Sequence, residues 1–271
     1  ACHYTATWTA DELDIDPSDG AYVIGTKDDW NRFCALVNSG NNYWSKTVKL
    51  TADIGTAQNP VTIKAGGWVE GNFKDFQASF DGQGHTLTVN YFDGAPFQGT
   101  INATIRNLHV AGNITANSQF AAGFVSEAHY GLTIENCRSS VAISSSVSGD
   151  GTHGGLVGVL YHDNNSNVNI TGCLFDGSMT TTNGTNNCGG FIGWSYNSSL
   201  TTLSNSVLAP TSVSSGMLEK TFVRYNSDTA PTITNTYYVH VDNLTENQGK
   251  EAHTITAGEN VSSVAIGGTA T

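Results

Sequence analysis

Charged side chains are scarce in this chain: only 13% of its 271 residues are Asp, Glu, Lys or Arg. A disordered chain of this length would carry charge in place of an apolar core, so the shortage argues against disorder. The charges present are mostly acidic, with a net charge of −12 and a pI near 4.8. Because such a chain repels phosphates, we expect neither nucleic acid nor an anionic membrane surface as a partner.

Long apolar runs and paired cysteines are also missing. No stretch approaches the roughly 20 apolar residues of a membrane span, so we expect no membrane insertion of this segment. The five cysteines are odd in number and show no CxxC spacing, which argues against a zinc site and a complete disulfide framework. Cys137 and Cys173 hold the same place in the repeat described next, and we expect two buried thiols there rather than a disulfide. We predict no metal and no cofactor.

The chain does contain a degenerate repeat of about 30 residues, in two linked registers. In the first, an apolar residue stands two places before an Asn or Gly, at positions 105, 134, 170, 203 and 233, which are 29 to 36 residues apart. The second register contains segments such as 155–158 (GLVG) and 190–193 (GFIG), and its aligned positions are 124, 156, 191 and 222. Two registers at one period predict coils of short strands stacked on one another. The Asn residues at the coil corners suit left-handed bends, because Asn tolerates positive φ.

The segments outside the repeat divide the chain into three predicted parts. Residues 1–20 are acidic and irregular, and we expect a solvated leader. Residues 21–243 form the stack with its N-terminal cap, which contains a helix over 27–38 with Thr26 as N-cap, Asp29 in a capping box and Gly40 at its end. That helix has one apolar face, so we expect it to cover the open end of the stack. Residues 244–271, with strands at 253–256 and 261–266, break the repeat, and we expect them to lead into a further domain.

The motifs resemble those of the GLUG-motif β-helix proteins of gut and other host-associated bacteria. The resemblance covers roughly residues 21–240 and is carried by the TKDDW helix, the TVKLTADI and FDGQGHTL segments and the GLVG-type coils. It implies an all-β fold, a right-handed parallel β-helix (solenoid) with one N-terminal capping α-helix. It also implies a secreted or cell-surface, adhesin-like bacterial protein whose signal peptide is absent from this segment. The motif itself is structural and implies no catalytic residues.

The loops after the second register carry aromatic and amide side chains at similar offsets. If these side chains stack, they form an aromatic strip that suits sugar rings or a protein partner. The candidate ligand-binding residues are Tyr130, Tyr161, His162, Asn164, Trp194, Tyr196 and Tyr225. The structural alternative is a tyrosine ladder that packs only against itself.

The leading prediction is a monomeric, non-enzymatic module that binds glycan or a host or bacterial surface protein through the β-helix face. One alternative is a polysaccharide-degrading hydrolase or lyase that uses Asp150, Asp163 or nearby acids, because such enzymes need two carboxylates around the scissile bond. We assign no catalytic residue, since no acid pair recurs at one repeat position. The second alternative is a structural stalk that spaces another domain from the cell.

Overall fold

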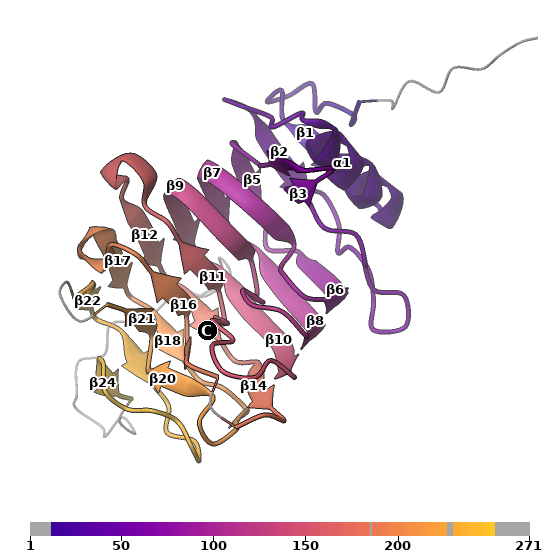
Figure 1. The fold of residues 1–271 in the computed structure, drawn as a ribbon. Helices are drawn as coiled ribbons and strands as arrows, with labels where there is room; N and C mark the ends of the chain where they lie inside the picture. The colour runs from indigo at the N-terminus through magenta and orange to yellow at the C-terminus, as the bar shows by residue number, and fades with distance from the viewer. Residues whose placement is uncertain (1–11, 185, 227–229, 253–271) are drawn as a thin grey trace, which may run out of the picture.

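The computed structural model describes residues 12–184, 186–226 and 230–252, and this part of the chain is mostly β, with long parallel sheets and one α-helix (Figure 1). The helix is α1 (Lys27–Ser39), and two short 3₁₀ turns are η1 (Asp163–Asn165) and η2 (Ser198–Leu200). No helix within the described residues is long and apolar enough to cross a membrane.

The strands form two large sheets and two small pairs. The 11-stranded sheet contains β1 (Tyr22–Ile24), β2 (Thr47–Leu50), β5 (Ser79–Asp81), β7 (Phe97–Arg106), β9 (Val125–Glu135), β11 (Val157–Leu160), β12 (Val168–Thr171), β16 (Ile192–Ser195), β17 (Thr201–Ser204), β21 (Val223–Tyr225) and β22 (Thr232–Thr234). The nine-stranded sheet contains β6 (Thr86–Phe92), β8 (His109–Ala116), β10 (Arg138–Ser145), β13 (Leu174–Phe175), β14 (Ser178–Thr181), β18 (Val207–Leu208), β19 (Ser212–Val213), β23 (Tyr237–Tyr238) and β24 (Lys250–Glu251). The small pairs are β15 (Cys188–Gly189) with β20 (Leu218–Lys220), which is parallel, and β3 (Gly67–Val69) with β4 (Asn72–Lys74), which is antiparallel.

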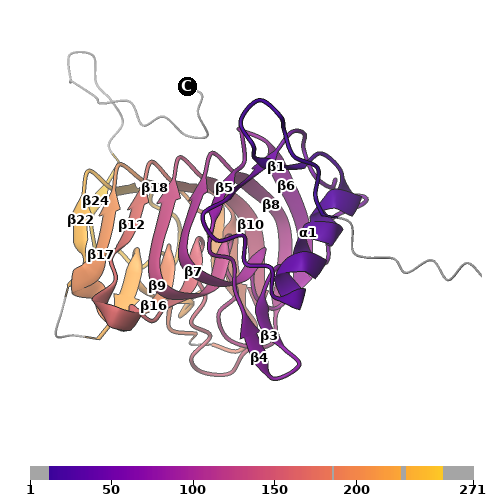
Figure 2. The same cartoon turned by 90° about the horizontal axis from the view of Figure 1, so that it is seen from above.

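Successive repeats lie side by side in parallel register, as the sequence period predicts. Ile105 pairs with Ile134, which pairs with Ile170, and the row continues through Leu203 to Ile233. The first four side chains of this row are fully buried. The second register holds too, since Val157 pairs with both Val125 and Ile192. Figure 2 shows the strands following one another from the N-terminal to the C-terminal end in chain order.

The corners between strands adopt the left-handed conformation that the sequence predicts. Asn107, Asn136, Asn205 and Asn235 have φ between 47° and 53°, and Gly172 has φ 64°. Their amides connect neighbouring repeats: Asn235 Nδ2 donates to Asn205 Oδ1 at 2.6 Å. A Cβ atom on Gly172 would lie 2.6 Å from Asn136 Oδ1, which explains why glycine replaces asparagine at this corner.

Helix α1 lies at the N-terminal end of the layered strands (Figure 2). The predicted capping box is present, because Thr26 accepts from the N–H of Asp29 and the Asp29 carboxylate accepts from Thr26. Gly40 ends the helix with φ 105°. The fully buried rings of Trp30 and Phe33 pack against aromatic rings of the first repeats: Phe76, Phe80 and Phe97.

At the C-terminal end, one side chain takes the place of a further strand beside β21. Gln248 Oε1 accepts from the N–H groups of Phe222 and Val223, at 2.9 and 2.8 Å. Its Nε2 donates to the carbonyl of Val223 at 2.9 Å. The amide of Gln248 therefore bonds to β21 as a neighbouring peptide would.

The structure describes part of the predicted N-terminal leader and four of the five cysteines. In the predicted leader, Asp16 and Asp19 hold the ammonium of Lys49 at 2.6 and 2.7 Å. The predicted strands at 253–256 and 261–266 and the residue Cys2 lie outside the described residues. The other four cysteines are buried free thiols, as expected for Cys137 and Cys173.

The buried His153 makes the stability of this fold depend on pH. Its Nδ1 accepts from the N–H of Ala121 at 3.1 Å, so the ring donates through Nε2 to Ser145 Oγ at 2.9 Å and has no acceptor for a second proton. Burial lowers the pKa of His153 from 6.5 to about 4. Between these pH values the unfolded chain binds the proton and the folded chain does not.

We therefore expect His153 to cost the fold about 3 kcal/mol of unfolding free energy as the pH falls from 6.5 to 4. Urea unfolding at several pH values measures this loss. His153→Gln keeps an acceptor and a donor but does not titrate, so its unfolding free energy should fall less steeply over the same range. Equal slopes for the two proteins would contradict the assignment.

Candidate functional site

Six ring-bearing side chains form a continuous row on the outside of the 11-stranded sheet and the hairpin beside it. We call this row the aromatic strip; it consists of Trp68, Phe73, His129, Tyr161, Tyr196 and Trp194. His129 and Tyr161 stack with centroids 4.4 Å apart, and Tyr161 and Tyr196 stack at 5.4 Å. Because these rings lie within 17° of parallel, they cover one another's faces along the row. Trp68, at one end, is 71% exposed, and Tyr196, next to Trp194 at the other end, is 61% exposed.

The parallel register explains why these rings meet. Leu160 pairs with Ala128 and with Ser195, so the residues that follow, His129, Tyr161 and Tyr196, come to adjacent positions. Side chains on neighbouring strands at one register position lie about 5 Å apart.

The β3–β4 hairpin supplies the first two rings of the strip. Its turn has positive φ at both Glu70 and Gly71, which suits a two-residue hairpin. Phe73 reaches the sheet over Gly99, where a Cβ atom would lie 2.5 Å from its ring. Gly99 is therefore needed for the hairpin to close against the strip.

Two acidic side chains are hydrogen-bonded to the middle of the strip. The hydroxyl of Tyr161 donates to Glu127 Oε2 at 3.2 Å, and Asp163 Oδ2 lies 2.9 Å from Nδ1 of His129. Burial raises the pKa of Glu127, although the Tyr161 hydrogen bond and the nearby His129 lower it in part. The strip thus combines ring surfaces with a carboxyl group that holds its proton to a higher pH than usual.

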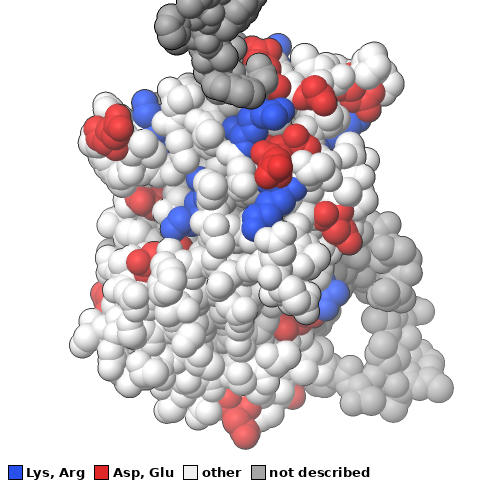
Figure 3. Space-filling model, turned by 90° about the vertical axis from the view of Figure 1, so that its right-hand side faces the viewer, with Lys and Arg blue, Asp and Glu red and all other residues white. Residues whose placement is uncertain are grey.

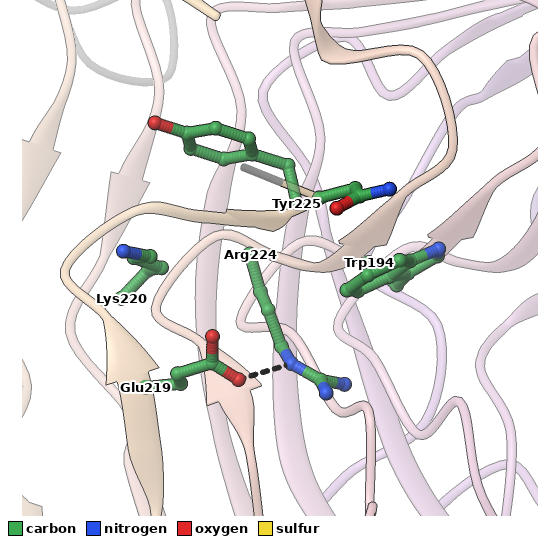
Figure 4. Close-up of a pocket in the computed structure, with 6 residues that line it drawn as sticks. Trp194, Glu219, Lys220, Arg224 and Tyr225 are labelled. Atoms are coloured by element: carbon green, nitrogen blue, oxygen red, sulfur yellow. Dashed lines mark hydrogen bonds and ion pairs between the residues drawn. The ribbon is translucent and has the colours of Figure 1, made fainter. Parts of the chain in front are cut away.

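The exposed end of the strip adjoins a pocket of about 450 Å³, which we call the Arg224 pocket (Figure 4). It is lined by Trp194, Glu219, Lys220, Arg224, Tyr225 and Asn226. The guanidinium carbon of Arg224 lies 4.7 Å from the centre of the Trp194 ring. The Lys220 ammonium lies 5.7 Å from the centre of the Tyr225 ring. The pocket therefore offers two aromatic walls together with charged and amide hydrogen-bonding groups.

A smaller hollow of about 280 Å³ is lined in part by Glu127. Asp93, with φ 56°, and Phe120, with φ 71°, line it as well. Asp93 Oδ1 accepts from the N–H groups of Asn117 and Ser118 at 2.6 and 2.8 Å. Two acidic residues with different surroundings, Glu127 and Asp93, therefore line this Glu127 hollow.

The structure brings together only some of the residues predicted from the sequence. Tyr161, Tyr196 and Trp194 lie in the strip, and Tyr225 lines the Arg224 pocket. Tyr130 lies at a corner with φ 60°, and its neighbour His129 holds the position in the stack.

The other two predicted residues, His162 and Asn164, lie apart from the ring contacts. The His162 ring is buried and bonded to Ser195 Oγ at 2.9 Å and to the Ser166 carbonyl at 2.9 Å, so it faces the interior. Asn164 is exposed on η1 with φ 55°.

The residues that the sequence reasoning missed divide into two kinds. His129 and Glu127 stand five and three places after Phe124, as Tyr196 and Trp194 stand after Phe191, so strict counting of the offset finds them. Trp68 and Phe73 lie outside the repeat, and only the hairpin signal of Glu70-Gly71 points to them.

The described residues contain no group of three or more His, Cys, Asp or Glu side chains that could hold a metal ion. Comparison of the chain with profiles of known families, with curated proteins and with solved structures finds no match. Function is therefore inferred from the geometry of the strip, the Arg224 pocket and the Glu127 hollow.

The hydrogen bond between Tyr161 and Glu127 gives a testable prediction. Tyr161→Phe removes the donor that lowers the Glu127 pKa, so we expect this pKa to rise further above its usual range. An NMR pH titration of the Glu127 carboxyl carbon measures the change. Tyr237→Phe, which removes a hydroxyl bonded to Asn235 instead, serves as the control. A Glu127 pKa that stays constant or falls in Tyr161→Phe would rule out this contact in solution.

Proposed function

We propose that this chain is a right-handed parallel β-helix that acts as an exported, adhesin-like, glycan-binding module on the surface of a host-associated bacterium. The observation that carries the glycan proposal is the aromatic strip ending in the exposed Tyr196 beside the Arg224 pocket. The β-helix part is supported by the parallel pairing of residues 29 to 36 positions apart through five repeats. The surface location is supported by the GLUG-type motifs.

Glycan recognition fits the chemistry of this end of the strip. Sugar rings present an apolar face of C–H groups, which packs on aromatic rings, and hydroxyl groups around the rim, which need hydrogen-bond partners. Tyr196 and Trp194 supply the rings, and Glu219, Lys220 and Asn226 supply polar groups within the same pocket. Trp194 lies on a strand fixed by parallel pairing, so little ordering is needed on binding.

Binding to a glycan array tests this proposal. We expect the purified chain to bind reproducibly and Trp194→Ala/Tyr196→Ala to lose about tenfold or more in affinity, because aromatic side chains carry most of the binding energy of such sites. Trp44→Ala is the matched control: Trp44 is 71% exposed but lies in a different pocket, with Lys46 and Gln77.

Each outcome of the array has a defined meaning. Loss in both variants would place the site elsewhere. Silence of the wild-type chain across a broad array would reject the glycan proposal and leave protein adhesion or a structural stalk. Circular dichroism of each variant shows that the fold is kept.

A second candidate function is polysaccharide cleavage, favoured by the Glu127 hollow. Glycoside hydrolysis uses one protonated and one ionised carboxyl group at the scissile bond. The raised pKa of Glu127 suits the acid, and Asp93 is the other carboxyl group in this cavity. Asp150 and Asp163, the acids considered from the sequence, are instead engaged with Arg224 and His129.

If the chain cleaves polysaccharide, new reducing ends should accumulate when it is incubated with a panel of plant and host polysaccharides. Glu127→Gln should then lower the rate by about a hundredfold or more, since the general acid is removed. Asp163→Asn, which alters the strip but not the hollow, is the control. Equal low rates for all three proteins would eliminate cleavage and leave binding.

A further inference from the structure

The positive charge of Arg224 is compensated by two carboxylates, of which Glu219 lines the same pocket. Its Nε donates to Glu219 Oε2 at 2.5 Å, and its Nη2 donates to Asp150 Oδ1 at 3.3 Å. Hydrogen bonding from Asn187, together with the charge of Arg224, lowers the pKa of Asp150, which therefore stays ionised at neutral pH.

The geometry also limits what Arg224 can offer to a ligand. Its side chain is only 11% exposed, and its plane is held against Trp194. Its Nη1 lies 3.4 Å from Thr152 Oγ1. All three guanidinium nitrogens thus have a partner within the protein, so Arg224 acts as a wall of the pocket. Glu219 and Asp150 are more open, at 40% and 50% exposed.

Resting on the proposed glycan-binding function, we propose that Glu219 and Asp150 determine specificity: they neutralise Arg224, so that the pocket accepts uncharged sugars and excludes acidic ones. An unpaired arginine beside two aromatic rings would bind the carboxylate of a uronic or sialic acid through a bidentate contact. With both carboxylates present, an acidic sugar meets like charge at the guanidinium edges that it would need.

Other charges complete the balance at the pocket and along the strip. The Lys220 ammonium also lines the pocket and offsets the second carboxylate, so these four charged groups together carry no net charge. Asp163 adds a carboxylate along the strip, and the chain as a whole carries −12. On the face shown in Figure 3, basic groups lie next to acidic ones and most of the surface is uncharged. A polyanionic glycan therefore gains no long-range attraction.

A glycan array that carries neutral, uronic-acid and sialylated glycans is the probe for this inference. We expect the wild-type chain to bind neutral glycans, and to bind acidic glycans with an affinity that is lower by about tenfold or more. Glu219→Gln/Asp150→Asn should gain about tenfold on acidic glycans, and the gain should shrink in 0.5 M salt, because salt screens the attraction between the pocket cations and the sugar carboxylate. The readout is the ratio of acidic to neutral glycan binding, which should rise in this variant relative to the wild-type chain.

The matched control is Asp14→Asn/Glu251→Gln. It alters net charge by the same amount at two exposed residues that do not line the pocket, and should leave the selectivity unchanged. Equal or stronger wild-type binding to acidic glycans would overturn the inference, as would a Glu219→Gln/Asp150→Asn variant that folds but gains nothing. Silence of the wild-type chain on all three glycan classes has a different meaning, because it rejects the proposed glycan binding itself.

Discussion

The arrangement of the whole chain depends on the parallel register that stacks one buried apolar residue of each repeat on the next. The row from Ile105 to Ile233 fixes this register, because a slip of one residue would turn every buried side chain to the solvent. The same register sets the outer surface. Because Leu160 is opposite Ala128 and Ser195, the rings of His129, Tyr161 and Tyr196 lie next to one another. The candidate site is therefore a consequence of core packing and needs no separate scaffold.

The stacked rings differ in how much of their surface is available to a ligand. A ring that lies between two parallel rings has both faces covered, so Tyr161 contributes stability and the position of Glu127 more than contact area for a ligand. The structural ladder and the binding strip considered from the sequence are thus two parts of one row. Its interior packs against itself, and its exposed end at Tyr196 and Trp194 is available for recognition.

The sequence predicts the period and the pairing rows well, because each copy of the repeat carries the same pattern. It predicts the single helix from its cap residues and its apolar face. The corner asparagines show this: positive φ at Asn107, Asn136, Asn205 and Asn235 follows from one pattern. The site is predicted less completely, since single-residue differences between loops decide which side chain enters the row. Tyr130 was aligned with Tyr161, yet His129 is the residue in the stack. His162 was grouped with the surface residues, whereas its ring bonds to Ser195 in the interior. Trp68 and Phe73 come from a hairpin outside the repeat, which no period can predict.

The end of the stack and the candidate site are linked through β21. Arg224 and Tyr225 follow Val223, whose N–H and carbonyl both bond to the amide of Gln248. An unpaired β21 would be free to fray or to pair with another chain, and the Arg224 pocket would lose one wall in either case. The Gln248 amide supplies the missing peptide partner without adding another strand over the pocket. The Arg224 pocket beside β21 therefore stays free of a further strand while the N–H and carbonyl of Val223 remain bonded. A binding pocket at the last strand of a sheet face requires both conditions at once, and the side-chain amide of Gln248 meets both.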